Sequence, residues 1–286
     1  MLQLLWNGLV TGLLVALPAL ALAMTFSVLR FANFAIGAML TAGAYLIFFF
    51  NVVLGFGLPL ATLAGALCAA ALAVLIDVLV FRLLRERSGV MLLVASMGVS
   101  FILENSVRLL AGSSPYSYAI EAARPLRIAG LRINIEQLHA AGASMLALLL
   151  IWLIFSHTRL GRAMRAIADN PELASVRGIS RQRVVTLTWI LSGALAAIAG
   201  MLIGIDTTLD PLMGWNYLLP VFAAAILGGL SRPMGAVAGA LIMGVVGELS
   251  TLILPPHYRT IAAFLVLSIL LLIRPAGLFG STWVRK

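Results

Sequence analysis

The residues best suited to chemistry in this sequence are carboxylates inside long apolar runs. Glu104 is followed one helical turn later by Arg108, whereas Glu248 has no basic residue within a turn and follows a glycine-rich stretch. Asp77 precedes Arg82 near the end of another run. A carboxylate in an apolar medium is costly unless it faces a cavity or a partner. We therefore expect Asp77 to pair with Arg82, and Glu104 and Glu248 to line a polar route, with an Arg108 pair as the structural alternative for Glu104.

Amide and hydroxyl side chains add polar atoms to the same apolar runs. Asn33, Thr41 and Ser100 could contribute to a polar route, but such groups serve equally well as hydrogen bonds between packed helices. The candidates for a translocation pathway are Asn33, Thr41, Ser100, Glu104 and Glu248.

No residue pattern of an enzyme or a metal site is present. The three histidines, His139, His157 and His257, lie near the ends of different apolar runs, too scattered for one metal site. Lys286 is the only lysine, and a phosphate-binding loop requires a lysine directly after its glycine. Cys68, the single cysteine, sits in an apolar run. We expect no enzyme activity and no cofactor in this chain; if ATP and Mg²⁺ drive its function, they bind another polypeptide.

The amino-acid composition indicates whether the elements that position these residues lie in water or in lipid. The 286 residues are 62% apolar and only 10% charged, against a usual charged fraction of about 25%. The mean hydropathy is +1.10, so there is too little polar surface for a water-soluble particle. The net charge of +9 comes from dispersed basic residues without interleaved aromatics, which argues against nucleic-acid binding.

Nine apolar stretches can be delimited along the chain. They fall at about 4–28, 34–55, 58–80, 90–110, 139–156, 184–205, 216–230, 234–254 and 259–274. A membrane-spanning helix needs roughly 20 apolar residues, so 216–230 and 259–274 are short for a full crossing. The sequence predicts an all-α polytopic membrane protein of about eight to nine transmembrane helices, folded as a single transmembrane domain over 1–286.

The distribution of basic residues predicts the orientation. Arginine and lysine accumulate in short cytoplasmic loops. One arrangement of nine spans places 14 basic residues inside and 5 outside, and the inverted arrangement reverses these numbers. We expect the N-terminus outside and the C-terminus in the cytoplasm.

Two connecting loops are long enough to hold structure. In the outer loop, 112–138, apolar residues alternate on either side of Ala129-Gly130, which predicts a small β-hairpin rather than a plain surface loop. In the cytoplasmic loop, 157–183, apolar and charged residues recur on opposite sides at helical spacing, which predicts an amphipathic helix. The residues are Leu160, Met164 and Ile167 on one side and Arg162, Arg165 and Asp169 on the other.

A second short helix is expected directly afterwards. Asn170 can cap it, Pro171 suits its first position, Glu172 complements its positive end, and Gly178 can close it. Such a basic loop either lies against anionic membrane lipid or docks into a groove of a cytoplasmic partner. The residues alone leave both alternatives open.

The segment from Gly161 to Ile179, which reads GRAMRAIADNPELASVRGI, resembles the cytoplasmic loop of branched-chain amino acid ABC transporter permeases. Glu172, Ala174 and Gly178 match the wider importer coupling motif Glu-Ala-Ala-x-x-x-Gly, with Leu173 in place of the middle alanine. Asn33 to Gly37 with Gly43 to Tyr45, Ile226 to Gly229 with Gly235 to Ala240, and Arg274 to Gly280 are similar to other signatures of this family. Length and an early first span resemble the LivH-type subunit.

The resemblance implies an inner-membrane permease of bacteria with four kinds of partner. These are a second, LivM-type permease subunit, two cytoplasmic ATPase subunits, an extracytoplasmic substrate-binding protein and membrane lipid. The ATPase-coupling residues it implies are Leu160, Gly161, Arg162, Met164, Arg165, Ile167, Asn170, Pro171, Glu172, Ala174 and Gly178. We expect the arginines and Glu172 to dock by charge, and Leu160, Met164 and Ile167 to fill an apolar groove of the ATPase.

Two expectations remain open beside this one. Arg124, Arg127 and Arg132 would present positive charge in the outer loop to an acidic rim of a binding protein. The alternative function is an ion- or proton-coupled secondary transporter of small polar solutes that uses Glu104 and Glu248 and needs no ATPase. Relatives of this type handle leucine, isoleucine and valine but also other amino acids, amides and urea, so the resemblance does not fix the substrate.

Overall fold

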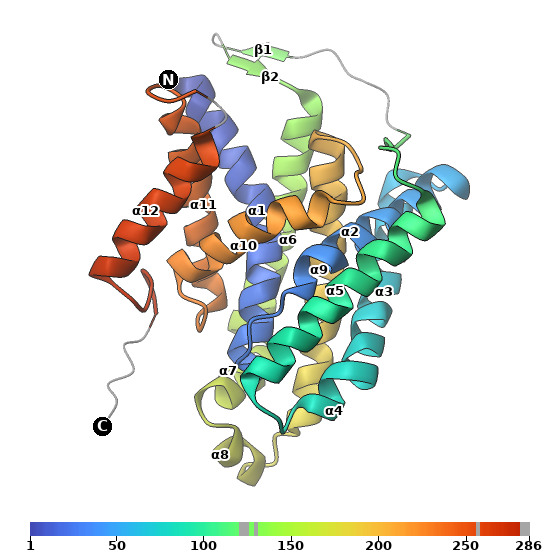
Figure 1. Cartoon of the computed structure of the whole chain (residues 1–286), viewed down its shortest axis with the longest axis vertical. Coiled ribbons are helices and arrows are strands. Elements are labelled where there is room, and N and C mark those ends of the chain that lie inside the picture. Colours follow the sequence, from blue (N-terminus) through green and yellow to red (C-terminus); the bar gives the residue numbers. More distant parts are fainter. Residues whose placement is uncertain (120–125, 129–130, 256–257, 281–286) are drawn as a thin grey trace.

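The apolar stretches form helices in the computed structural model, which describes residues 1–119, 126–128, 131–255 and 258–280 (Figure 1). Within these residues, seven helices are long and apolar enough to cross a membrane. They are α1 (Leu2–Leu29), α2 with the π-helix η1 (Ala35–Phe48 and Phe49–Val53), α3 with η2 and α4 (Leu58–Ile76, Asp77–Phe81 and Arg82–Leu84), α5 (Gly89–Ala111), α6 (Ile135–His157), α9 (Arg181–Asp206) and α11 (Pro233–Ser250).

Two further apolar helices are shorter, α10 (Met213–Gly228) and α12 (Arg259–Ile273). At 1.5 Å per residue they are about 24 and 22 Å long, less than the roughly 30 Å of a hydrocarbon core. The prediction of an all-α, multi-pass membrane protein is confirmed, and the expected eight to nine membrane helices are roughly consistent with seven long and two short apolar helices in the described residues. The two stretches singled out as short are the two short helices.

Helix α1 forms the centre of the bundle and contacts α6, α9, α10 and α11 (Figure 1). Every residue from Leu14 to Met24 is buried. Its closest neighbour is α11, because Gly8 and Gly12 on α1 lie against the backbone around Gly244 on α11. Small residues at a helix crossing allow this approach where lipid supplies no hydrophobic driving force.

Helix α2 is enclosed by α3, α5, α9 and α10. On α9, Gly200 lies against the Leu40 carbonyl and Ala197 lies against Gly43 of α2. These two small residues of α9 therefore pack against α2 of the same chain. At the start of α2, Gly37 meets Gly214 near the start of α10, so these two helices begin close together inside the bundle.

One end of the bundle, called the hairpin end below, carries the predicted β-hairpin. Strands β1 (Leu126–Ile128) and β2 (Leu131–Ile133) pair antiparallel, which confirms the hairpin. Gln3 of α1 accepts from the Arg132 backbone N–H at 2.9 Å and donates to its carbonyl at 3.0 Å. Because α6 starts at Ile135, the outer connection ends at 134 rather than at the expected 138.

The described start of this connection, residues 112–119, is tied to the bundle by two tyrosines. Tyr116 forms an isolated antiparallel bridge with Leu209, in the connection between α9 and α10. Tyr118 is buried and donates its hydroxyl to the Ala44 carbonyl at 2.9 Å. Burial raises the pKa of the Tyr118 phenol, so this group remains a neutral donor at physiological pH.

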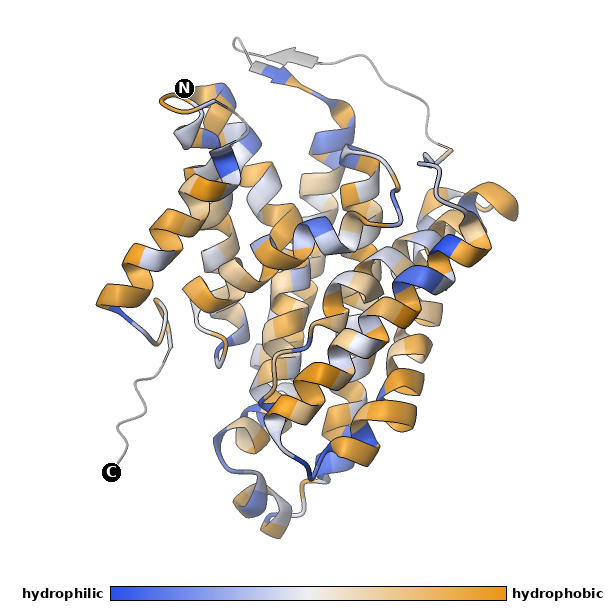
Figure 2. Ribbon diagram, viewed as in Figure 1, coloured by the Kyte–Doolittle hydropathy of each residue, from blue (hydrophilic) through white to orange (hydrophobic). Residues whose placement is uncertain are grey.

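The opposite end, called the α7–α8 end below, carries α7 (Arg159–Asp169) and α8 (Pro171–Val176) (Figure 1). Figure 2 shows hydrophilic residues gathered at the two ends and hydrophobic residues along the helices between them. The described chain from Thr158 to Ser180 connects α6 to α9, slightly shorter than the expected loop of 157–183.

The end of α3 corrects one sequence expectation. Asp77 does not pair with Arg82: Arg85 Nη2 donates to both Asp77 carboxylate oxygens, at 2.6 and 2.7 Å. The reason is that Asp77 starts the π-helical turn η2, which changes the helical register and brings residue 85, eight positions later, under the carboxylate. Arg85 also donates to Gln182 Oε1 of α9 at 2.7 Å, so this ion pair joins the end of the α3–η2–α4 segment to α9.

Candidate functional site: the α7–α8 connection and the polar groups of the bundle

Helix α7 is amphipathic, as predicted, and its apolar side is occupied by its own chain. Met164 and Ile167 are each 1% exposed, Gly161 is buried and Leu160 is half-buried. These residues pack α7 against α1, α6 and α9. The expectation that Met164 and Ile167 fill a groove of a partner is therefore wrong, because neither side chain is accessible; they anchor α7 to the bundle. Arg162 is exposed, as expected.

The turn from α6 into α7 is tight and depends on glycine. Thr158 caps α7 by accepting from the Gly161 backbone N–H at 3.2 Å. A Cβ at position 161 would overlap the backbone of Phe155, so only glycine fits there. Arg165 is exposed, and its Nη1 donates to the Phe155 carbonyl, which joins α7 to the end of α6.

The far end of α7 is held by α1. Arg30 follows α1 in a left-handed conformation, φ +58°, and its Nη2 donates to the Ala168 carbonyl at 2.8 Å. A basic group near the last carbonyls of a helix satisfies unpaired acceptors and opposes the negative end of the helix dipole. Both ends of α7 are thus fixed to membrane helices.

Helix α8 forms as the sequence predicts. Asn170 Oδ1 accepts from the backbone N–H groups of Glu172 at 3.1 Å and Leu173 at 3.0 Å, and Pro171 is the first helical residue. Ala174 is buried. Gly178 has φ +80°, a left-handed conformation that favours glycine and ends the helix. The capping, initiating and closing roles read from the sequence are confirmed.

The outer side of α8 presents two apolar residues that the sequence analysis missed. Leu173 is 57% exposed and Val176 is 84% exposed, and Glu172 stands exposed beside them. Exposed aliphatic side chains rimmed by polar residues are typical of a protein interface. Their positions three residues apart on a capped helix were the available signal, overlooked because the longer α7 carried the stronger amphipathic pattern.

The cap of α8 gives a first test. We expect Asn170→Ala to lower the local stability of α8 by about 1 kcal/mol, because two backbone N–H groups lose their acceptor. Hydrogen exchange of the α8 amides in detergent-solubilised protein should accelerate roughly fivefold. Ser175→Ala, which removes an exposed hydroxyl bonded only to the Pro171 carbonyl, is the control and should change exchange little. Equal exchange rates in the Asn170→Ala variant and the wild type would contradict the capping role.

The amide and hydroxyl pathway candidates lie inside the chain. Asn33 and Thr41 are 0% and 1% exposed, and Ser100 is buried. Asn33 Oδ1 accepts from the Ala35 N–H at the start of α2, and Thr41 Oγ1 accepts from the Gly214 N–H of α10 at 2.9 Å. These contacts join and cap helices, as in the alternative role of hydrogen bonding between packed helices. None of the three side chains lies on the surface of the chain.

The two carboxylate candidates are both paired with arginine. Arg108 donates to Glu104 at 2.6 Å within α5, the pair raised as an alternative. Glu248 of α11 is 4% exposed and accepts from Arg259 of α12 at 2.5 Å. The sequence showed no basic residue within a turn of Glu248 because its partner comes from the next helix. Each negative charge is therefore compensated, as burial in a membrane requires.

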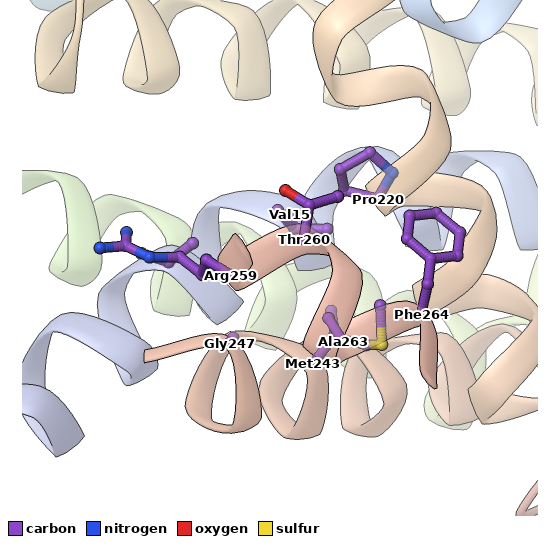
Figure 3. Close-up of a pocket in the computed structure, with 11 residues that line it drawn as sticks. Val15, Pro220, Met243, Gly247, Arg259, Thr260, Ala263 and Phe264 are labelled. Atoms are coloured by element: carbon purple, nitrogen blue, oxygen red, sulfur yellow. The ribbon is translucent and has the colours of Figure 1, made fainter. Parts of the chain in front are cut away.

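A small cavity is lined in part by Arg259, the partner of Glu248 (Figure 3). It has a volume of about 100 Å³ and is lined by α1, α10, α11 and α12. Val15, Pro220, Met243 and Phe264 make it largely apolar. Ligand pockets usually measure about 300–1,000 Å³. The cavity is thus too small for an amino acid in this conformation.

The three outer-loop arginines are placed only in part. Arg124 lies outside the described residues. Arg127 and Arg132 stand opposite one another in the hairpin register, and Arg132 is exposed at the hairpin end. The backbone thus brings two of the three basic positions together.

Comparison with known proteins places this architecture in a family. The family model described as the permease component of branched-chain amino acid transport systems matches residues 4–273. This chain belongs to that family. The match includes α7, α8 and every helix of the bundle, so these elements are those of a membrane permease.

Two relatives align with the permease over its whole length. It is 31% identical to the high-affinity branched-chain amino acid transport system permease protein LivH of Escherichia coli K12 and 30% identical to BraD of Pseudomonas aeruginosa. Both alignments cover 100% of this chain and 97% of the relative. Among solved structures, PsaBC from Streptococcus pneumoniae in complex with Fab aligns with a TM-score of 0.47 and 15% identity, over 92% of this chain and 89% of that chain.

Proposed function

We propose that this permease is the membrane subunit of an ATP-driven importer of branched-chain or related amino acids in a bacterial inner membrane. The observation that carries the proposal is the family match over residues 4–273, together with a capped α8 whose exposed side is free for a partner. ATP and Mg²⁺ would bind two cytoplasmic ATPase subunits. A second, LivM-type permease and an extracytoplasmic binding protein would complete the assembly.

The proposed orientation puts the α7–α8 end in the cytoplasm. Arg82, Arg87 and Arg181 are exposed at this end beside the arginines of α7. Positive charge favours the cytoplasmic side. The N-terminus, joined to Arg132 of the hairpin, then lies outside. The hairpin would lie on the side of the binding protein, and the basic α7–α8 end would also lie near anionic lipid.

In the coupling mechanism we propose, α8 contacts the ATPase and α7 transmits the movement of α8 to the membrane helices. An ATPase would seat Leu173 and Val176 in an apolar groove and pair with Glu172. Because α7 is held by Arg30 at one end and by the Phe155 turn at the other, displacement of α8 would move α1 and α6 together. Packed helices transmit such shifts because their interfaces are not continuously deformable.

The docking role of α8 can be tested by co-purification. We expect Glu172→Arg and Gly178→Asp to reduce ATPase recovery with the tagged permease at least tenfold, since the first reverses an interface charge and the second strains the helix end. Glu86→Arg makes the same charge change at an exposed site of the same end and is the matched control. Recovery equal to wild type in both variants, with normal membrane insertion, would argue against α8 as the docking element.

The energy source can be tested in proteoliposomes that contain the complete assembly and labelled leucine. We expect uptake to require ATP inside with the binding protein outside, and to survive collapse of ion gradients by ionophores. Uptake that continues without ATP but stops with the ionophores would instead support the ion-coupled alternative. The structure weakens that alternative, because Glu104 and Glu248 are already paired with arginine.

A further inference from the structure

One face of the bundle carries exposed polar and aromatic side chains along membrane-length helices. We call it the α5–α10 face; it consists of Phe101, Glu104, Asn105 and Arg108 of α5 and Trp215 and Asn216 of α10. Phe101 is 57% exposed and Trp215 50% exposed, and their rings stack with centroids 6.3 Å apart. Asn105 and Asn216 are exposed beside them. The two helices therefore form one continuous surface, with the enclosed α2 behind it.

The polar residues of α5 on this face lie within a helix long enough to cross a membrane. Helix α5 runs from the α7–α8 end to the hairpin end, and Glu104 lies roughly 22 Å along it at 1.5 Å per residue. A hydrocarbon core is roughly 30 Å thick. Figure 2 shows the hydrophilic colouring on the half of α5 nearer the hairpin. Groups of this kind facing lipid chains would each cost a few kcal/mol, so the face requires another neighbour.

Other faces of the bundle have the composition expected for lipid contact. The exposed residues in the middle of α6, between positions 143 and 155, are Met145, Leu146, Leu149, Leu150, Trp152 and Leu153. On α3, Leu63 and Leu67 are about 60% exposed. Neither set includes an amide or a charged group. The composition of the α3 and α6 faces therefore fits contact with lipid, whereas that of the α5–α10 face fits contact with protein or water.

The ion pair on this face is accessible on both of its partners. The Glu104 and Arg108 side chains are 13% and 35% exposed. Among the described residues, the other two ion pairs each contain a carboxylate that is nearly enclosed: 1% for Asp77 and 5% for Glu248. A ligand approaching from outside the chain can therefore reach both charges of only the Glu104–Arg108 pair.

We propose that the α5–α10 face is this chain's wall of the translocation path, and that Glu104 and Arg108 bind the two charges of a zwitterionic amino acid. The substrate ammonium would replace Arg108 as the partner of Glu104, and the substrate carboxylate would replace Glu104 as the partner of Arg108. Each charge stays compensated during this exchange. Phe101 and Trp215 would contact the apolar side chain. The proposal rests on the proposed function for the class of substrate.

The first test asks whether water reaches this face in the complete assembly. In a Cys68→Ala background, Asn105→Cys and Asn216→Cys are treated with a charged, membrane-impermeant thiol reagent. Leu149→Cys, on the exposed aliphatic face in the middle of α6, is the control. We expect both asparagine positions to react at least tenfold faster than position 149. Equally slow reaction at all three positions overturns the proposal.

The second test addresses the ion pair with labelled leucine in proteoliposomes. We expect Glu104→Gln and Arg108→Gln each to lower leucine uptake per ATP hydrolysed about tenfold or more, because each removes one charge-assisted contact. ATPase activity stimulated by the binding protein should change less than twofold. If the pair had a merely structural role, its loss would lower ATPase activity together with uptake. Uptake per ATP equal to wild type in both variants overturns the role of the pair.

The two tests separate this proposal from the proposed function. Failure of the wild-type assembly to take up leucine with ATP contradicts the proposed function, whereas the thiol-reaction rates still report on the α5–α10 face. Uptake that is ATP-driven in the wild type and unaffected by either glutamine variant contradicts only the role of Glu104 and Arg108.

Discussion

Replacing Asp77 with alanine is expected to destabilise the permease by about 3–5 kcal/mol. The Asp77 side chain is 1% exposed, and that of Arg85 is 11% exposed. Removal of the carboxylate would leave the Arg85 guanidinium nearly buried with one remaining side-chain acceptor, Gln182. An uncompensated buried charge costs far more than the intact pair contributes. The same change would also loosen the contact between α3 and α9.

Thermal unfolding in detergent measures this loss, and we expect the midpoint to fall by about 10 °C. A double variant, Asp77→Ala with Arg85→Met, removes both charges and should recover much of the stability, because the desolvation cost disappears together with the attraction. Glu86→Gln alters an exposed carboxylate next to Arg85 and is the control. If the Asp77→Ala and Glu86→Gln variants unfold at the same midpoint temperature, the pair contributes nothing to folding.

The helical framework could be predicted from the sequence because membrane spans depend on local composition. Each apolar stretch forms a helix, and the two stretches shorter than a crossing form the two short helices. The ends were less accurate. Helix α6 begins at Ile135, several residues before the apolar run at 139, since the hairpin ends at Ile133 and leaves no room for further loop. A neighbouring element fixed this end, and composition does not show it.

Partners between elements could not be predicted, because they depend on how helices pack. Glu248 meets Arg259 across two helices, and Asp77 meets Arg85 through a π-helical turn that changes the spacing. The pairing of Glu104 with Arg108 was foreseen, since it follows from the four-residue spacing of an α-helix alone. Sequence reasoning thus reached contacts within one regular helix and not beyond it.

The connection that carries α7 and α8 shows the same limit at a finer scale. The caps by Asn170 and Gly178 are local and were predicted correctly. The amphipathic pattern of α7 revealed an apolar side but not what covers it. Met164 and Ile167 face the permease's own bundle, and the exposed residues are Leu173 and Val176 of α8. An apolar side of a helix predicts that another surface covers it, whereas only the fold shows whether that surface belongs to the same chain.

At the crossing of α1 with α11, we expect the addition of one methyl group to cause the second large loss of stability. We expect Gly244→Ala to destabilise the permease by about 3 kcal/mol. A Cβ at position 244 would overlap the Gly8 carbonyl and the Gly12 backbone of α1. Backbone atoms cannot rotate away as a flexible side chain can, so the two helices must separate along their most extensive contact. The loss of close packing should spread to α10 and α9, which pack against the same central helix.

The matched control is the same substitution where space is open. Gly142 lies within α6, and nothing is within 4 Å of a Cβ built there. Because alanine is favoured over glycine inside a helix by about 1 kcal/mol, Gly142→Ala should leave the unfolding midpoint unchanged or raise it. Gly244→Ala should lower the midpoint by several degrees and reduce the folded yield in detergent. If both variants melt at or above the wild-type temperature, α1 and α11 do not approach as closely as Gly8, Gly12 and Gly244 require.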